Sequence, residues 1–151
     1  MKKNQQKKTI GLQKNGFTLI ELLMVVSIIA LLTALIVASF SQSKKKSRDA
    51  RRVSDIRTLA QALAMYHNNY QVYPCSDISC NGTEVRITGS DNMSMSLKAE
   101  GIINADVIDP LNDGTHRYWY SSAGDTYVLR FCQETDFIRD LEANCNNVVQ
   151  P

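Results

Sequence analysis

The chain opens with stretches whose apolar residues follow different patterns. Residues 17–40 are apolar almost throughout, and Glu21 is their one charged side chain. This run has 24 residues and no Gly or Pro, so as a helix it would extend about 36 Å, enough to cross a bilayer core. From Leu22 to Phe40, thirteen large apolar side chains favour insertion by about 4 to 8 kcal/mol, against about 3 kcal/mol for one carboxylate. The pattern predicts a membrane-spanning helix.

The next stretch is amphipathic. Its apolar residues recur at spacings of three or four, a helical period: Val53, Ile56, Leu59, Leu63, Tyr66 and Tyr70. The opposite face is polar: Arg52, Asp55, Arg57, Gln61, His67 and Asn68. We therefore predict one helix from about residue 17 to 69, weakened locally around residues 39–43, whose second half packs on a small domain.

Beyond Pro74 the sequence favours short strands and turns. The signals are a strand at 84–88, a short helix at 91–100, and a hairpin of strands 116–122 and 126–132. The predicted fold class is α+β, with the long helix packed on a small antiparallel sheet. Four segments follow from this reading: a basic leader (1–16), a transmembrane and assembly helix (17–40), its amphipathic continuation (41–74) and a globular head (75–151).

Charge is distributed unevenly along the 151 residues, whose formal net charge is +2. Residues 1–16 hold five lysines and no acid, and residues 44–57 hold seven cations against two acids. Residues 76–151 hold five cations against twelve acids, a balance of −7. The overall charge is therefore no argument for nucleic-acid binding. The length leaves room for one domain and an appendage.

Four cysteines, Cys75, Cys80, Cys132 and Cys145, all follow the apolar run. An even number in a small domain after a membrane segment indicates an oxidising compartment and two disulfides. A zinc site is the competing interpretation, but it requires closely spaced pairs that this chain lacks. Of the three connectivities, we favour Cys75 with Cys80 and Cys132 with Cys145, because both close locally.

Glu21 distinguishes three interpretations of the amino-terminal region. A secretory signal peptide cut near Ala38 and Ser39 remains open, although the apolar run is long for that class. A plain membrane anchor leaves the carboxylate unexplained. Cleavage between Gly16 and Phe17 would create an amine one helical turn from Glu21. That amine on one copy could neutralise the carboxylate of its neighbour and set the register of a helical assembly.

This region resembles the processing motif of the type IV pilin and type II secretion pseudopilin superfamily, in the residues Gly16-Phe17-Thr18-Leu19-Ile20-Glu21-Leu22-Leu23. The resemblance implies that a prepilin peptidase removes the leader after Gly16 on the cytoplasmic side. Phe17 then becomes the N-methylated terminus, and Glu21 is the assembly carboxylate. It also implies a single-pass cytoplasmic-membrane precursor with its head outside, which an assembly platform and its ATPase build into a periplasmic or extracellular filament with other subunits.

The resemblance covers residues 8–74, including the helix exit that ends at Tyr73-Pro74. Many members have a proline midway along the membrane half, where this chain has Ala38. Some major pseudopilins hold calcium in a comparable loop before a Tyr-x-Tyr strand. The corresponding oxygen donors here are Asp109, Asp113 and Asp125. Turn aspartates also commonly cap backbone groups, so calcium and a purely structural role both stay open.

Three functions follow from these observations. The leading one is a structural filament subunit of a pilus or pseudopilus. The alternatives are a DNA-binding minor pilin, whose basic run at 44–57 contacts phosphates, and a membrane-anchored ectodomain that does not polymerise. The same basic run also suits lipid headgroups next to a membrane span. We expect no enzyme, because no serine, cysteine or metal constellation has recognisable catalytic spacing.

Overall fold

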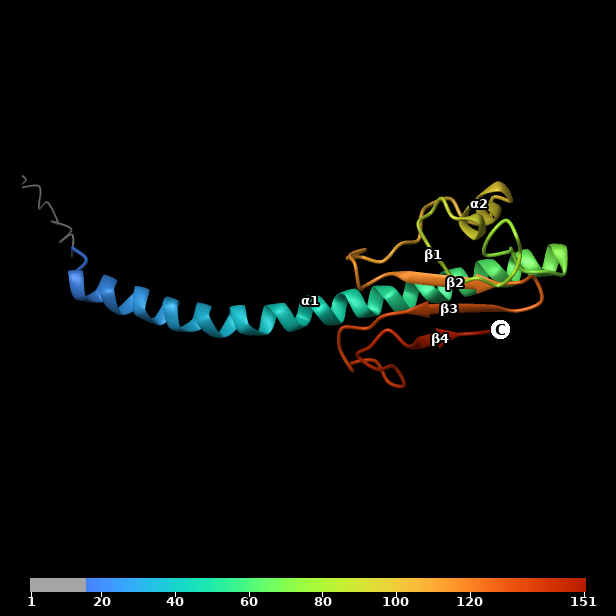
Figure 1. Cartoon of the computed structure of the whole chain (residues 1–151). Coiled ribbons are helices and arrows are strands. Elements are labelled where there is room, and N and C mark those ends of the chain that lie inside the picture. Colours follow the sequence, from blue (N-terminus) through green and yellow to red (C-terminus); the bar gives the residue numbers. More distant parts are fainter. Residues whose placement is uncertain (1–15) are drawn as a thin grey trace, which may run out of the picture. The chain divides into compact units, whose positions relative to one another are not determined.

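The structure, a computed structural model, describes residues 16–151 apart from the side chains at positions 35, 37 and 38. The leader predicted at 1–16 therefore lies outside the described residues except for Gly16. The elements along the chain, drawn in Figure 1, are α1 (Leu19–Tyr70), β1 (Val85–Arg86), α2 (Asn92–Ala99), β2 (Tyr118–Ser122), β3 (Tyr127–Phe131) and β4 (Asn147–Val149). Internal contacts divide the chain into two units, with the boundary between Ser39 and Phe40. The α+β fold class is confirmed.

Helix α1 has 52 residues and continues through residues 39–43, where we expected weakening. The reason is compositional, since this stretch contains neither Gly nor Pro to remove a hydrogen bond or to loosen the backbone. The helix ends at Tyr70, and Gln71 follows with a left-handed φ of 59°. Such a residue just past the last turn is a common way to end a helix.

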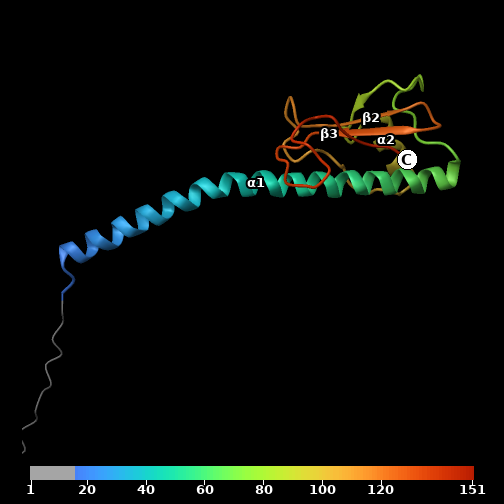
Figure 2. The same ribbon diagram turned by 90° about the horizontal axis from the view of Figure 1, so that it is seen from below.

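The predicted apolar stripe of α1 faces the core of the head except at its last residue, Tyr70, which is 45% exposed. Ile56, Leu59 and Leu63 are buried, in one cluster with Tyr120 and Leu129 of the sheet. Figure 2 shows the sheet lying along one side of the head part of α1. Burial of these side chains, at about 1.5 to 3 kcal/mol each, is the main force that docks the helix on the sheet.

The sheet has four antiparallel strands in the order β1-β2-β3-β4. In the central hairpin Tyr118 pairs with Phe131 and Tyr120 with Leu129, so alternate side chains face α1 as the sequence predicted. Strand β1 has two residues, fewer than the five expected. Strand β4 pairs with β3 and was missed, because three residues are too few to show an alternating pattern.

The two disulfides join Cys75 to Cys80 and Cys132 to Cys145. These are the pairs that local closure favours. The second disulfide closes the loop between β3 and β4, and Asn147 helps to hold that loop by donating to the carbonyl oxygens of Glu142 and Asn144. The carboxy-terminal segment is therefore a closed loop followed by an edge strand.

Candidate functional site at the start of the long helix

The predicted processing point lies at the entrance of α1. Gly16, Phe17 and Thr18 precede the helix, and all three are exposed. The Phe17 side chain is 78% exposed, and a Cβ added at Gly16 would meet no atom within 4 Å. Nothing in the described part of the chain covers the bond between Gly16 and Phe17, so no residue from 17 to 151 blocks access to it.

Glu21 belongs to a reciprocal cap with Thr18. The Glu21 carboxylate accepts hydrogen bonds from the Thr18 backbone N–H at 2.9 Å and from its hydroxyl at 2.7 Å. The Thr18 hydroxyl in turn accepts from the Glu21 backbone N–H at 3.3 Å. This capping box satisfies donors that a helix start leaves free, and it places the negative charge at the positive end of the helix dipole.

Sequence reasoning had assigned Glu21 a partner on another copy and missed its partner on the same chain. The signal was available, because Thr18 and Glu21 have the spacing of a capping box. The two contacts are compatible. A carboxylate accepts up to about four hydrogen bonds, and Thr18 occupies only one of the two Glu21 oxygens in the described contacts. The cap therefore positions the carboxylate beside the predicted new terminus.

The helix beyond the cap is suited to lipid. α1 contains a stretch apolar and long enough to cross a membrane, and none of that stretch is buried within the chain. Its hydroxyl groups are satisfied internally, since Ser27 donates to the Met24 carbonyl and Thr33 to the Ile29 carbonyl, both at 2.7 Å. No polar group of these two side chains would then need a partner from lipid.

A buried ionic cluster fixes the head to α1. Arg52 is fully buried, and its guanidinium binds Asp109 through two hydrogen bonds of 2.7 and 3.1 Å. The same group donates to Asp49 and to Glu134, each at 2.8 Å. One side chain thus joins α1 to the loop before β2 and to the chain after β3. We expected Arg52 on the exposed polar face, and that prediction was wrong.

Two further contacts complete this ionic cluster. Arg48 forms a bidentate pair with Glu134, at 2.5 and 2.7 Å. Buried Asp49 accepts from the backbone N–H groups of Glu134 and Thr135, each at 2.9 Å. The bond from Arg48, reinforced by Arg52, lowers the pKa of Glu134 to about 2. The spacing of Asp49 and Arg52 was a weak signal for a local pair, but their distant partners could not be inferred from it.

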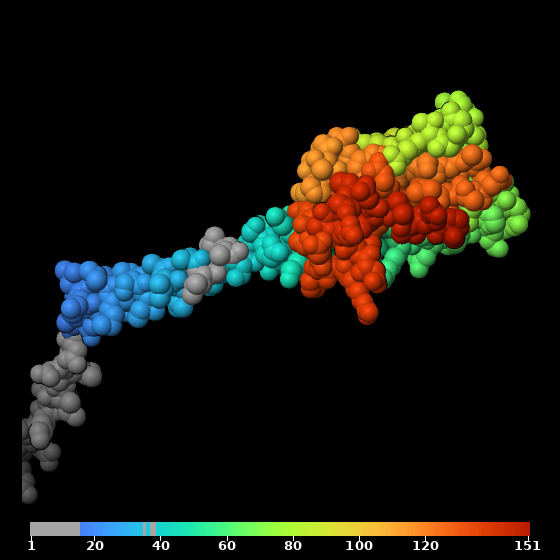
Figure 3. Space-filling model, turned by 60° about the horizontal axis from the view of Figure 1, so that its bottom comes forward, coloured from blue at the N-terminus to red at the C-terminus, as the bar shows by residue number. Residues whose placement is uncertain are grey.

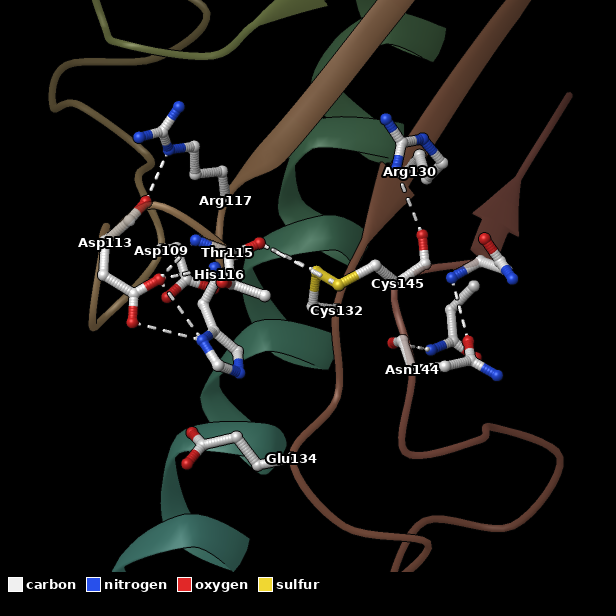
Figure 4. Close-up of a disulfide and its surroundings, with 12 residues drawn as sticks. Asp109, Asp113, Thr115, His116, Arg117, Arg130, Cys132, Glu134, Asn144 and Cys145 are labelled. Atoms are coloured by element: carbon white, nitrogen blue, oxygen red, sulfur yellow. Dashed lines mark hydrogen bonds and ion pairs between the residues drawn. A yellow bond between two sulfur atoms is a disulfide. The ribbon is translucent and has the colours of Figure 1, made fainter.

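The three aspartates predicted as calcium ligands have separate roles, and Figure 4 shows two of them, Asp109 and Asp113. Asp109 binds Arg52 and caps the backbone N–H of Leu111 at 2.8 Å. Asp113 accepts from the backbone N–H groups of His116 and Thr115, which lower its pKa to about 2. Asp125 is exposed in the β2–β3 turn. Among residues 16–151, no three acidic, histidine or cysteine side chains are grouped to hold a metal ion. Calcium binding stays a prediction.

Comparison with known proteins agrees with the geometry of the helix entrance. A model of the prokaryotic N-terminal methylation motif matches residues 12–37, which include Gly16, Phe17 and Glu21. The type II secretion system core protein G of Vibrio cholerae is 32% identical over 114 residues, 75% of this chain and 74% of that protein. The chain belongs to the type IV pilin and type II secretion pseudopilin superfamily.

Other pseudopilin relatives match over shorter lengths. The core protein G of Pseudomonas aeruginosa is 29% identical over 98 residues, 65% of this chain and 68% of that protein. The core protein G of Escherichia coli is 37% identical over 65 residues, 43% of this chain and 45% of that protein. These relatives are named as secretion-system components and not as enzymes. No solved structure matches the chain significantly.

Proposed function

We propose that this pseudopilin-family chain is a structural subunit of a type II secretion pseudopilus. The observation that carries the proposal is the exposed Gly16-Phe17 bond directly before a helix with Glu21 in its first turn, in a chain similar to core protein G. A prepilin peptidase cuts this bond, and Phe17 becomes the methylated terminus. The precursor spans the cytoplasmic membrane once, and its head reaches the periplasm, where the oxidised cysteines are stable.

The membrane half of α1 supplies the driving contact for assembly. Its side chains are exposed within the isolated chain, as Leu22 at 58%, Ile28 at 51% and Leu31 at 69% illustrate. Lipid covers them before assembly, and neighbouring helices must cover them in a filament, because leaving that surface in water is costly. Moving the subunit out of the bilayer therefore requires both helix–helix packing and an ATP-driven assembly platform.

Glu21 sets the register of that packing. Cleavage leaves the ammonium of Phe17 four residues from the carboxylate, and Thr18 already holds the carboxylate at the helix entrance. Between helices, the ammonium of one copy meets the Glu21 of the next. Any stagger that leaves either charge buried without a partner is penalised by several kcal/mol, so one relative position is selected.

The DNA-binding alternative is weakened by the ionic cluster. Of the basic residues from 44 to 57, Arg52 is fully buried and Arg48 is paired with Glu134. Their positive charges are neutralised by acids of the head and are not presented to phosphates. Lys44 and Lys46 instead lie over the rings of Phe40 and Phe137.

The test compares Glu21→Ala with Thr18→Ala in cells that carry the secretion machinery. We expect Glu21→Ala to be cleaved normally and to lose incorporation into filaments, because the new terminus has no partner. Thr18→Ala serves as the control, since it removes the cap hydroxyl and keeps the carboxylate, and it should retain most assembly. Filament yields equal to wild type for Glu21→Ala, measured in sheared fractions and by electron microscopy, would contradict the proposal.

A further inference from the structure

The sheet face opposite α1 carries a row of cations around the single tryptophan. Register pairs Arg86 with Trp119 and Trp119 with Arg130, so these three side chains lie next to one another across β1, β2 and β3. Their strand neighbours Tyr118 and Tyr120 point into the core, which places the row on the other face. The Arg130 guanidinium lies 4.2 Å from the centroid of the Trp119 ring.

A third arginine extends this basic face. Arg117 directly precedes β2, two residues before Trp119, and Figure 4 shows its side chain donating to the Asp113 backbone carbonyl, with Arg130 nearby on β3. The face thus gathers three of the five cations of residues 76–151, a region that holds twelve acids. Glu84 neutralises Arg130 through bonds of 2.5 and 2.7 Å. Arg86 donates to the side-chain oxygen of Asn112 and Arg117 to the backbone carbonyl of Asp113. Both acceptors are uncharged, so these two arginines keep their positive charge on a head that is rich in acids.

The complementary chemistry lies in the loop between β3 and β4. Asp136, Asp140 and Glu142 are exposed within seven residues, together with one cation, Arg139. Phe137 in the same segment is 60% exposed, although Lys46 lies over its ring at 4.6 Å. The Cys132–Cys145 disulfide closes this loop, and Figure 3 shows part of it projecting from the head. Residues 136–142 therefore form an acidic segment with an aromatic side chain available for contact.

We propose that the basic face of one copy binds the acidic segment 136–142 of a second copy. Arginines meet carboxylates, and the exposed ring of Phe137 meets the Trp119 side of the face, a pairing that aromatic residues favour. The two surfaces differ, so the contact is head-to-tail and repeats from copy to copy without needing two-fold symmetry. This inference rests on the proposed function, in which heads are neighbours in a filament, and adds which surfaces they join.

The experiment places the photoreactive residue p-benzoylphenylalanine at position 137 of the full chain, in cells that assemble filaments. Irradiation should give covalent dimers whose cross-link maps to the peptide around residues 117–130 of the other copy. Arg117→Glu in the same chain should lower the dimer yield about fivefold or more, because attraction becomes repulsion. Arg51→Glu, which makes the same charge change on an exposed site of α1, should leave the yield unchanged. The same probe at Ile78, which is 98% exposed, is the control for random collision.

The outcomes separate this inference from the proposed function. Filaments without a cross-link from position 137 to the basic face, or with one to another segment, overturn the inference and leave the filament function standing. An equal effect of Arg51→Glu and Arg117→Glu also overturns it. Loss of both filaments and dimers in the wild-type chain contradicts the proposed function as well.

Discussion

Replacing Arg52 by methionine tests the ionic cluster that holds the head on α1. The change keeps an unbranched apolar side chain, shorter than arginine, and removes the charged guanidinium together with its bonds to Asp49, Asp109 and Glu134. Removing one partner of a buried ion pair typically costs about 3 to 5 kcal/mol, because the remaining charge is left uncompensated. Asp109 and Asp49 keep backbone donors, which places our expectation near the lower end, at about 3 kcal/mol.

Urea unfolding of the full chain in non-ionic detergent, followed by Trp119 fluorescence, measures this loss. We expect the midpoint to fall with an unchanged slope, which indicates lost stability without a change in the surface exposed. Arg51→Met is the matched control. The Arg51 side chain is 66% exposed and lies 3.7 Å from Asp55, so its removal should cost under about 1 kcal/mol. Arg52→Lys should be intermediate, because an ammonium cannot make the bidentate bond with Asp109.

The reasoning is refuted if Arg52→Met costs no more than Arg51→Met. That result would mean that, in the wild-type chain, the cost of desolvating Arg52 and its acids cancels their attraction. Losing Arg52 would then change the free energy of unfolding little. The attachment of the head to α1 would then have to be assigned to the apolar contact between α1 and the sheet alone.

Three further predictions concern pH, the disulfide and metal ions. In the folded chain the pKa of Glu134 lies near 2, below its ordinary value of 4.5. The stability that Glu134 contributes is therefore present above about pH 4.5 and is lost as the pH falls toward 2. Between these pH values the free energy of unfolding of Glu134→Gln should fall less than that of the wild type. Replacing Cys132 and Cys145 together by serine should lower unfolding stability by about 3 kcal/mol through the freed loop, as measured by urea unfolding. Calcium chelation should leave the melting temperature unchanged, because both oxygens of Asp109 already accept hydrogen bonds from Arg52. A fall of several degrees that added calcium reverses would instead support calcium binding.

The elements that the sequence predicted correctly are those whose apolar residues recur with a regular period. The α1 stripe of Ile56, Leu59 and Leu63 and the Tyr118–Tyr120 alternation both repeat often enough to identify an element and its buried face. The processing residues can be predicted from the sequence because their signal is local, with Gly16, Phe17 and Glu21 within six consecutive positions.

The features that the sequence did not predict depend on contacts between residues that are distant in the chain. Arg52 was assigned to the polar face because charge predicts exposure, but Asp109 and Glu134 lie 57 and 82 residues away and turn it inward. Strand β4 forms only because β3 offers an edge, so its three residues carry no signal of their own. The structure gives the three predicted calcium ligands separate contacts, since Asp113 caps its own turn and Asp109 binds Arg52 of α1. Calcium binding itself stays a prediction.

The most direct measurement is the intact mass and amino-terminal sequence of the protein recovered from its filament-forming host. We predict a chain that begins at Phe17 with an N-methyl group and lacks the lysine-bearing leader, with Glu21 four residues from the new amine. A chain that still begins at Met1, or one that begins near Ser39 after removal of the whole apolar run, would contradict assembly through α1.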